Sequence, residues 1–340
     1  MLTNTEASGA DARSSLPVLA DIEAAAKRLA GHAQRTPLLS FAELDRRLGT
    51  RAFIKPECLQ VTGSFKFRGA YNKIKSALGG GGKIPGVVAF SSGNHAQGVA
   101  AAAAQLGVAA IIVMPQDAPR IKIENTKALG AEVKLYDRYK EDREAIARSI
   151  ARDKGYLVVP PYDDPAIIAG QGTIGLEIAE DFARMGIAPD VVLAPCSGGG
   201  LISGIATAIK TRYPEARVYA CEPARFDDTA RSLAAGKRLE NAGNERSICD
   251  ALLSKSPGEI TFAINRTLLS GGLTATDEEA LAAVAFAARR MKLVVEPGGA
   301  IALAAALQGR APKPAKNIAI VCSGGNIDDE MLRKALEGAG

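Results

Sequence analysis

The chain has 340 residues, of which 47% are hydrophobic and 23% are charged. That composition excludes a disordered chain, and at about 150 residues per domain the length predicts two domains or one large bilobal unit. The net charge of +5 is mild for this length, and no basic run is interleaved with aromatic residues, so no nucleic-acid partner is expected.

Short apolar runs alternate with longer alanine-rich segments along the chain. The expected strands cover residues 51–57, 87–90, 109–115, 131–136, 156–160, 191–196, 217–221 and 317–322. The expected helices cover residues 67–78, 94–106, 120–129, 140–153, 166–184, 201–213, 277–291 and 299–307. The strands are continuous apolar runs, which are typical of parallel strands covered by helices on both faces. The order predicts a doubly wound α/β fold, in which ligands bind at the carboxyl ends of strands.

The chain shows no sign of a membrane or secretory location. It has no stretch of about 18 uninterrupted apolar residues, and residues 1–17 contain no apolar h-region. Its five cysteines are an odd number, lie far apart and include no CxxC pair, which is typical of a reducing compartment. We therefore expect a cytoplasmic protein. Two histidines are too few for a His-rich metal site or for most His-based triads.

Lys66 lies between Phe65 and Phe67, where a predicted loop turns into a helix. Most lysines are ordinary surface residues. In apolar surroundings, however, the charged form of a lysine is destabilised, so its pKa falls and the neutral amine becomes available for Schiff-base chemistry. The sequence thus offers two interpretations of Lys66, a surface residue and a covalent catalyst.

The segment Ser91-Ser92-Gly93-Asn94-His95 follows a predicted strand and opens an alanine-rich helix. The free N–H groups at a helix start attract a carboxylate or a phosphate. A plain serine N-cap is the alternative, although five consecutive small or polar residues exceed what a cap needs. By itself, His95 is also compatible with a purely structural role.

The segment Ser197-Gly198-Gly199-Gly200-Leu201 also leads from a predicted strand directly into a helix. Three glycines let the backbone wrap an anion with its N–H groups, and the helix dipole adds attraction. The spacing fits neither the GxGxxG nor the GxxxxGK[ST] fingerprint. The placement favours a phosphate cradle over tight helix–strand packing alone.

Two more polar segments follow predicted strands. Ser323 begins a Ser-Gly-Gly-Asn segment after the last strand, where it either points into the same crevice or belongs to a turn. Glu222, Asp227 and Asp228 follow another strand. Clustered carboxylates with backbone carbonyls suit a hard divalent cation, and a solvated loop is the alternative.

Six segments occur in order at plausible spacings: SFKFRGAYNKI, SSGNHAQGVA, PAIIAGQGTIGLEI, SGGGLISGIA, EPGGAIALAAA and CSGGNID. From Ile22 to Asp328 the chain resembles the threonine/serine dehydratase and serine racemase family of fold-type II pyridoxal-phosphate enzymes. The resemblance implies a tryptophan synthase β-like α/β fold with two open, twisted, mostly parallel sheets flanked by helices. It also implies a large cofactor-binding domain, residues 1–84 and 162–340, and a small mobile domain, residues 85–161.

The resemblance assigns cofactor roles to matching positions. Lys66 resembles the lysine that holds pyridoxal 5'-phosphate as a Schiff base. The other implied cofactor-binding residues are Asn94 at the phenolic oxygen, Gly198, Gly199, Gly200 and Leu201 at the phosphate, Glu296 near the cofactor and Ser323 at the pyridine nitrogen. Ser197 stands where the family often has a fourth glycine, but it still offers a backbone N–H.

Other positions match the family's substrate and cation sites. Ser91, Ser92 and His95 resemble the site for the carboxylate of a small amino-acid substrate. Glu222, Asp228 and the carbonyl of Phe226 resemble a divalent-cation site, which suits Mg²⁺ or Ca²⁺. The family also implies a homodimer or a homotetramer.

The implied activity is that of a dehydratase, or ammonia-lyase, which converts a β-hydroxy amino acid such as L-threonine or L-serine into a 2-oxo acid and ammonia. Lys66 would act as the general base at Cα. Ser323 offers the ring nitrogen a neutral partner, which restrains carbanion delocalisation and suits β-elimination.

Alternatives remain open within the same framework. Ser92 is typical of racemases and hydroxyaspartate dehydratases, in which it would be a second catalytic acid/base opposite Lys66. Tyr162 instead stands where racemases tend to have asparagine, and Ala251 replaces a frequent glycine. The alternatives are a serine or aspartate-type racemase, or a dehydratase for 3-hydroxyaspartate or in the hydroxyectoine pathway. A binding protein without chemistry is disfavoured because Lys66, Asn94 and Ser323 are all present.

Overall fold

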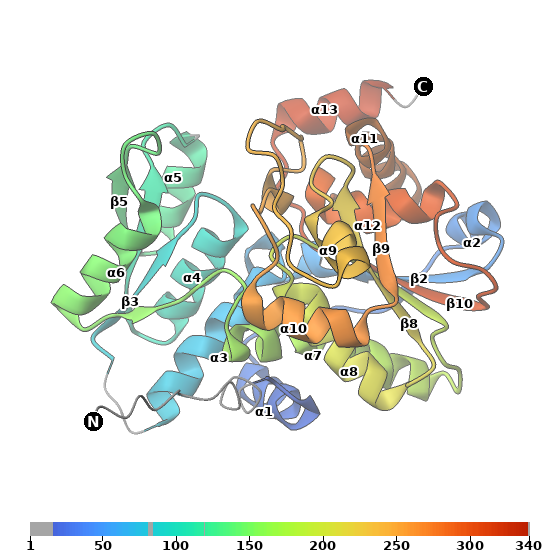
Figure 1. The fold of residues 1–340 in the computed structure, drawn as a ribbon, viewed down its shortest axis with the longest axis horizontal. Coiled ribbons are helices and arrows are strands. Elements are labelled where there is room, and N and C mark those ends of the chain that lie inside the picture. Colours follow the sequence, from blue (N-terminus) through green and yellow to red (C-terminus); the bar gives the residue numbers. More distant parts are fainter. Residues whose placement is uncertain (1–15, 81–83, 119, 339–340) are drawn as a thin grey trace, which may run out of the picture.

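The computed structural model describes residues 16–80, 84–118 and 120–338. Its strands form two sheets, one of six and one of four strands, which lie side by side with helices around them (Figure 1). Alternate residues of a central strand pack into different hydrophobic clusters, as Ile320 and Val321 do. Each sheet is therefore covered on both faces, and the predicted α/β fold with two mostly parallel sheets is confirmed.

The larger sheet combines segments from both ends of the chain. Its order is β1 (Leu39–Ser40), β2 (Arg51–Pro56), β10 (Asn317–Cys322), β7 (Val191–Pro195), β8 (Arg217–Pro223) and β9 (Gly271–Ala275). All neighbouring strands pair in parallel except β1 and β2. The smaller sheet has the order β5 (Glu132–Tyr136), β4 (Ala109–Pro115), β3 (Gly86–Phe90) and β6 (Leu157–Val158), all parallel.

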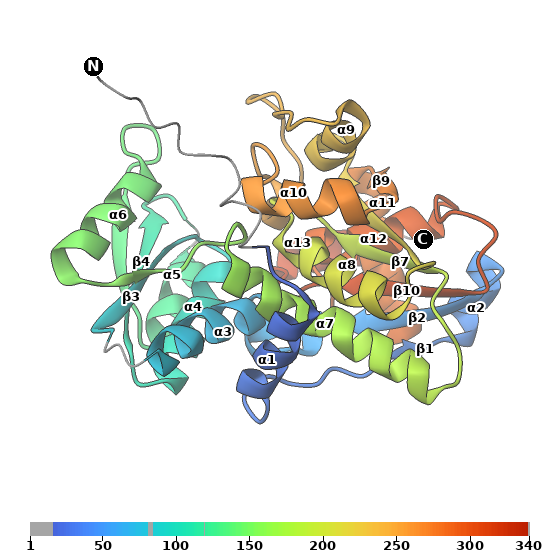
Figure 2. The same cartoon turned by 60° about the horizontal axis from the view of Figure 1, so that its bottom comes forward.

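The helices fill the connections between these strands. They are α1 (Leu19–Leu29), α2 (Ala42–Leu48), α3 (Lys66–Gly79), α4 (Asn94–Gln105), α5 (Arg120–Ala128), α6 (Arg143–Lys154), α7 (Pro165–Arg184), α8 (Gly200–Arg212), α9 (Asp228–Ala235), α10 (Glu259–Leu268), α11 (Asp277–Phe286), α12 (Pro297–Leu307) and α13 (Asp329–Gly338). α3 packs against both α4 and α7, and so lies between the two sheets (Figure 2). Within the described ranges, none of the helices combines the length and apolar character needed to cross a membrane.

The observed elements differ from the expected ones in two main respects. The short strands β1 and β9 and the helices α1, α2, α9, α10 and α13 were not expected. The helix expected over residues 277–291 is α-helical only to Phe286 and continues as a π-helical turn, Ala287–Met291. Lys292 then ends the turn in the left-handed region, with a φ of 60°. This break redirects the chain toward Glu296, which precedes α12.

The polar segments singled out in the sequence lie at corresponding ends of parallel strands. Lys66 follows β2, the Ser91–His95 segment follows β3, and the glycine segment around Gly199 follows β7. Ser323 follows β10, which is hydrogen-bonded to both β2 and β7. Because β2, β10 and β7 are parallel neighbours, the segments that follow them lie at one edge of the larger sheet, and the Ser91–His95 segment lies at the corresponding end of a strand in the smaller sheet. Ligands bind at such strand ends in parallel sheets.

A buried cluster of two cations and two anions anchors α3 to the larger sheet. Arg68 is 1% exposed, and its guanidinium donates to both Glu57 oxygens at 2.8 Å and to Glu177 at 2.6 and 3.0 Å. Lys55, which is fully buried on β2, donates to Glu177 at 2.5 Å. Although burial alone raises the pKa of Glu57, Arg68 holds it below its ordinary value. The charges balance, so the cluster joins β2, α3 and α7 without a net buried charge.

A close approach of two helices sets the direction of α8. A Cβ on Gly204 would lie 2.4 Å from the Ile168 carbonyl oxygen and 2.5 Å from the Gly172 nitrogen, both in α7. A side chain at position 204 would therefore force the helices apart. This contact fixes the N-terminus of α8, which carries the glycine segment.

We predict that Arg68→Met destabilises the protein by about 3–5 kcal/mol, because it leaves two buried carboxylates without their main partner. Urea unfolding measures the free energy of unfolding. Arg333→Met is the matched control, since Arg333 is exposed on α13 and pairs with Glu337 at 3.0 Å; its effect should stay within about 0.5 kcal/mol. An Arg68→Met protein as stable as this control would contradict the anchoring role of the cluster.

Candidate active site

Lys66 is the first residue of α3, and its side chain turns toward the smaller sheet. Its Nζ donates a 2.7 Å hydrogen bond to the Pro161 carbonyl oxygen and lies 5.1 Å from the centre of the Phe65 ring. Burial lowers the pKa of Lys66 to about 8, and within the described part of the chain no carboxylate forms an ion pair with it. The neutral amine is therefore well populated near physiological pH.

The start of α4 lies next to Lys66. A Cβ on Gly98 would lie 3.0 Å from the carbonyl carbon of Lys66 and 3.0 Å from the nitrogen of Phe67. A side chain at position 98 would crowd this contact, which places the N-terminal half of α4 against the start of α3. Figure 1 shows the two helices between the sheets.

The first turn of α4 offers free donors. The N–H groups of Asn94, His95 and Ala96 have no acceptor within the described residues, as the helix geometry dictates. The Ser91 hydroxyl accepts from the Gly93 N–H at 3.2 Å. The Ser92 hydroxyl has no partner among the described residues and is only half-buried. Three N–H groups and a free hydroxyl form a site suited to a carboxylate.

His95 is neutral in this environment. Its Nε2 lies 2.9 Å from the Val159 carbonyl oxygen, which can only accept, so Nε2 carries the hydrogen. Burial, reinforced by the charge of Lys66, lowers the pKa of His95 to about 3. The imidazole therefore offers no positive charge to a substrate. What His95 can offer to the predicted carboxylate site is its backbone N–H.

Asn94 at the start of α4 meets Glu296, which precedes α12. The Asn94 Nδ2 donates to Oε1 of Glu296 at 2.6 Å, and its Oδ1 accepts from Asn326 at 2.7 Å. A Cβ on Gly324 would lie 2.3 Å from the same Glu296 oxygen, so the site requires glycine there. Burial, reinforced by the charge of Asp250, raises the pKa of Glu296 to about 8, so this carboxyl group is protonated at neutral pH.

Ser323 is adjacent to the start of α3. Its carbonyl oxygen accepts from the Phe65 N–H at 3.1 Å, and the residue is 5% exposed. No described residue is hydrogen-bonded to its hydroxyl. The structure thus holds a neutral, unpaired hydroxyl beside Lys66.

The glycine segment forms a buried cradle at the N-terminus of α8. Gly199 has a φ of +98°, a conformation that side chains other than glycine rarely adopt. The N–H groups of Gly198, Gly199 and Gly200 are buried and have no acceptor in the described chain. Buried donors without acceptors are costly, so their convergence indicates an anionic ligand. Leu201, the next residue, adds a fourth N–H in the first turn.

Tyr162 connects the cradle to Lys66. It follows Pro161, which accepts the hydrogen bond from Lys66, and a Cβ on Gly198 would lie 2.4 Å from the Tyr162 ring. The structure therefore brings together Lys66, the start of α4, the Asn94–Glu296 pair, Ser323 and the cradle.

The family model described as pyridoxal-phosphate dependent enzyme matches residues 29–324. The chain belongs to this family. An L-threo-3-hydroxyaspartate ammonia-lyase of Pseudomonas sp is 41% identical over 318 residues, which cover 94% of this chain and 98% of that protein. A serine racemase of Schizosaccharomyces pombe is 39% identical over 315 residues, which cover 93% of this chain and 96% of that protein. Among solved structures, a threonine deaminase from T.th. has a TM-score of 0.85 and 46% identity, and covers 92% of this chain and 99% of that chain.

Pyridoxal phosphate fits the groups that the structure gathers. Its aldehyde requires a neutral amine, which Lys66 offers, and its phosphate requires the unpaired N–H groups of the cradle. Its ring nitrogen requires a polar partner, and the Ser323 hydroxyl is unpaired. This protein is thus a pyridoxal-phosphate dependent enzyme of the ammonia-lyase and racemase group.

Two carboxylates lie behind the cradle, at the end of β8. Glu222 accepts from the Thr229 and Ala230 N–H groups at 2.9 and 2.8 Å. Asp228 is 1% exposed, and its Oδ2 has no hydrogen-bond partner. The Phe226 carbonyl oxygen also has no donor in the described chain. Among the described residues, no group of three or more His, Cys, Asp or Glu side chains is placed to hold a metal ion.

Several site residues escaped the sequence analysis. Asn326 lies in the same Ser-Gly-Gly-Asn segment as Ser323, so the sequence could place it near the site. Its hydrogen bond to Asn94 could not be predicted from the sequence. Ser254 contacts the cradle through Ser197, and nothing in the local sequence indicates this.

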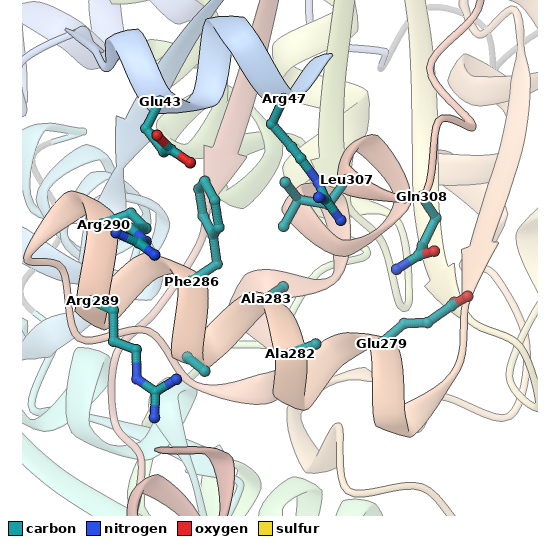
Figure 3. A pocket seen from close by; sticks show the side chains of 11 residues that line it. Glu43, Arg47, Glu279, Ala282, Ala283, Phe286, Arg289, Arg290, Leu307 and Gln308 are labelled. Atoms are coloured by element: carbon teal, nitrogen blue, oxygen red, sulfur yellow. The ribbon is translucent and has the colours of Figure 1, made fainter. Parts of the chain in front are cut away.

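A separate hollow of about 280 Å³ is lined by α2, α11, the π-helical turn Ala287–Met291 and the end of α12. Figure 3 shows side chains that line it. None of the predicted site residues lines it.

We predict that Lys66 in the cofactor-free protein reacts as an amine with a pKa of about 8. Because the pKa is lowered, the neutral fraction rises through pH 8 and levels off above it, whereas an ordinary lysine gains reactivity up to about pH 10.4. Competitive acetylation with peptide mass spectrometry measures this, with the exposed Lys334 as the internal reference. A Lys66 profile that parallels Lys334 up to pH 10 would contradict the effect of burial.

Proposed function

We propose that this enzyme is an ammonia-lyase that converts a β-hydroxy amino acid, L-threonine or L-serine, into a 2-oxo acid and ammonia. The observation that carries the proposal is the pairing of a buried, easily deprotonated Lys66 with the neutral, unpaired hydroxyl of Ser323. When pyridoxal phosphate is bound, a neutral hydroxyl at its ring nitrogen would supply a weaker electron sink than a carboxylate partner, which would favour loss of a β-substituent.

Each residue of the site has a role in this reaction. When bound, pyridoxal phosphate supplies the aldehyde for the substrate amine and the electron sink that acidifies Cα. The N–H groups of Asn94, His95 and Ala96 hold the substrate carboxylate at the start of α4. Lys66, once released as a free amine, takes the Cα proton as general base, and its ammonium form can return a proton to the departing β-hydroxyl. The enamine product tautomerises, and water hydrolyses it to the 2-oxo acid and ammonia.

Three similarities support L-threonine or L-serine as substrate. Besides the threonine deaminase structure, an L-threonine ammonia-lyase of Thermotoga maritima is 41% identical over 318 residues, which cover 94% of this chain and 78% of that protein. The catabolic L-threonine dehydratase TdcB of Escherichia coli is 39% identical over 316 residues, which cover 92% of this chain and 94% of that protein. Tyr162, whose ring packs against Gly198 of the cradle, stands where racemases of the family tend to have asparagine, which also favours a dehydratase.

Racemisation is the second candidate, and Ser92 is the observation that favours it. Its hydroxyl has no partner among the described residues and lies in the turn that opens α4. A second acid/base on the opposite face of the substrate could return a proton there and invert Cα. The similarity to serine racemases and to hydroxyaspartate ammonia-lyases is consistent with this activity or with a 3-hydroxyaspartate substrate.

We also propose that residues 85–161 form a mobile domain that closes over the substrate. Lys122 on α5 donates to Asp250 in the opposite domain at 2.9 Å. Both charges influence the pKa of Glu296, so this pair lies at the edge of the active site. Closure would expel water and bring the start of α4 onto the substrate carboxylate.

Two further features belong to the proposal. Mg²⁺ or Ca²⁺ would bind Glu222, Asp228 and the Phe226 carbonyl oxygen, since these hard oxygen ligands suit such cations. The proposed assembly is a homodimer or homotetramer, and the proposed location is the cytoplasm.

The test is product analysis with L-threonine, L-serine, D-serine and the 3-hydroxyaspartate isomers, each with pyridoxal phosphate and Mg²⁺. We expect 2-oxo acid as the main product, highest with L-threonine or L-serine. In Ser92→Ala we expect any inversion to fall by about 10²–10⁴-fold while elimination persists, because only inversion needs the second acid/base. Dominant inversion in the wild type would overturn the ammonia-lyase assignment, and preference for 3-hydroxyaspartate would overturn the proposed substrate.

A further inference from the structure

A chain of hydrogen bonds joins the proposed cation site to the phosphate cradle. It runs from Asp228 through Asn241 and Ser254 to Ser197, which immediately precedes Gly198. These residues come from different connections of the larger sheet: Ser197 follows β7, Asp228 begins α9, and the other two lie in the segment between α9 and α10.

Asn241 is held in one orientation. It is 8% exposed, and its Nδ2 donates both to Oδ1 of Asp228 at 2.6 Å and to the Ser254 carbonyl oxygen at 2.9 Å. Its Oδ1 accepts from Arg231 at 2.7 Å. A rotated amide would lose all three bonds. The position of the Asp228 carboxylate therefore determines the position of Asn241 and, through it, of Ser254.

Ser254 and Ser197 hold each other through two contacts. Their hydroxyl oxygens lie 2.6 Å apart, and the Ser254 N–H donates to Oγ of Ser197 at 3.2 Å. Nearby, the Gly198 carbonyl oxygen accepts from the Gly258 N–H at 3.1 Å and from the Thr261 hydroxyl at 2.6 Å. The segment between α9 and α10, together with the start of α10, therefore makes hydrogen bonds to both Ser197 and Gly198. The Ser197 side chain takes part in these contacts. A glycine at position 197 could not make this bond.

Asp228 has one oxygen left for a ligand. Its Oδ1 is occupied by Asn241, whereas its buried Oδ2 has no partner. A cation at Oδ2 would fix the carboxylate against the repulsion of Glu222 without displacing Asn241. The side of Asp228 that faces the cradle would then be held in the geometry described above.

We propose that Ser197 and Ser254 are positioning residues through which a divalent cation at Asp228 strengthens cofactor binding by the cradle. This inference rests on the cation site of the proposed function. Because binding linkage is reciprocal, the cation increases the affinity for pyridoxal phosphate by the same factor by which pyridoxal phosphate increases the affinity for the cation. The hydroxyl pair between Ser197 and Ser254 carries the coupling.

The experiment measures the coupling factor directly, without turnover. Cofactor-free full-length protein is titrated with pyridoxal phosphate in excess Mg²⁺ and in EDTA, and the visible absorbance of the bound cofactor gives Kd. Calorimetry gives the Mg²⁺ Kd with and without the cofactor. The variants are Ser197→Ala, Ser254→Ala and the double variant, and the control is Thr267→Ala, which removes an exposed hydroxyl on α10.

In the wild type and in Thr267→Ala we expect Mg²⁺ to lower the pyridoxal-phosphate Kd by about 5-fold or more, with the same factor in the reciprocal titration. In both single variants we expect pyridoxal phosphate and Mg²⁺ each to bind on their own, but the factor by which one changes the Kd of the other falls below about 2-fold. The double variant should show no further loss, because both changes remove one shared bond.

Two results would overturn the inference. One is a wild-type factor below about 2-fold, and the other is a full factor in either single variant. If Mg²⁺ does not bind even in the absence of cofactor, the cation site of the proposed function fails as well. If Mg²⁺ binds but does not change the affinity for pyridoxal phosphate, the inference is wrong, whereas the proposed cation site is still supported.

Discussion

The neutral cluster of Arg68, Glu57, Glu177 and Lys55 is the constraint on which the site depends. A buried charge is tolerated only when it is paired. If Arg68 moved, it would leave the carboxylates of Glu57 and Glu177 without their guanidinium partner in the low-dielectric interior. Arg68 lies two residues after Lys66, in the first turn of α3. The cluster therefore fixes Lys66 relative to the larger sheet, and it does so with charges that are kept away from the amine. Lys66 itself faces no carboxylate partner and is easily deprotonated.

Around this fixed lysine, the site is assembled by close approaches of backbone. Gly98 lets α4 reach Lys66, Gly324 leaves room for Glu296, and the cradle glycines leave N–H groups without acceptors in the described chain, where we propose that the cofactor phosphate binds. Each approach comes from a different strand end. Burial keeps the polar side chains here uncharged at neutral pH, since it leaves His95 neutral and Glu296 protonated. The pyridoxal-phosphate site thus consists mainly of oriented dipoles around one amine.

The parallel sheets and the segments at their ends could be predicted, because buried strands are continuous apolar runs and glycine-rich turns stand out between them. β9 could not, since it begins with Gly271 and Gly272 and forms a half-buried edge. The π-helical turn before Lys292 gives no local signal, because its residues suit an α-helix. The Asn94–Glu296 bond and the Ser197–Ser254 pair link residues far apart in sequence, and only the folded chain brings them together. The neutral state of His95 likewise follows from burial beside Lys66.

The central claim is that Lys66 is the residue to which the cofactor is attached. Borohydride reduction of the holoenzyme makes that attachment permanent, and peptide mass spectrometry then locates the pyridoxyl group. The account predicts one group per chain, on the peptide that contains Lys66, with Lys55 and Lys122 unmodified. A pyridoxyl group on another lysine, or full incorporation in Lys66→Ala, would contradict it.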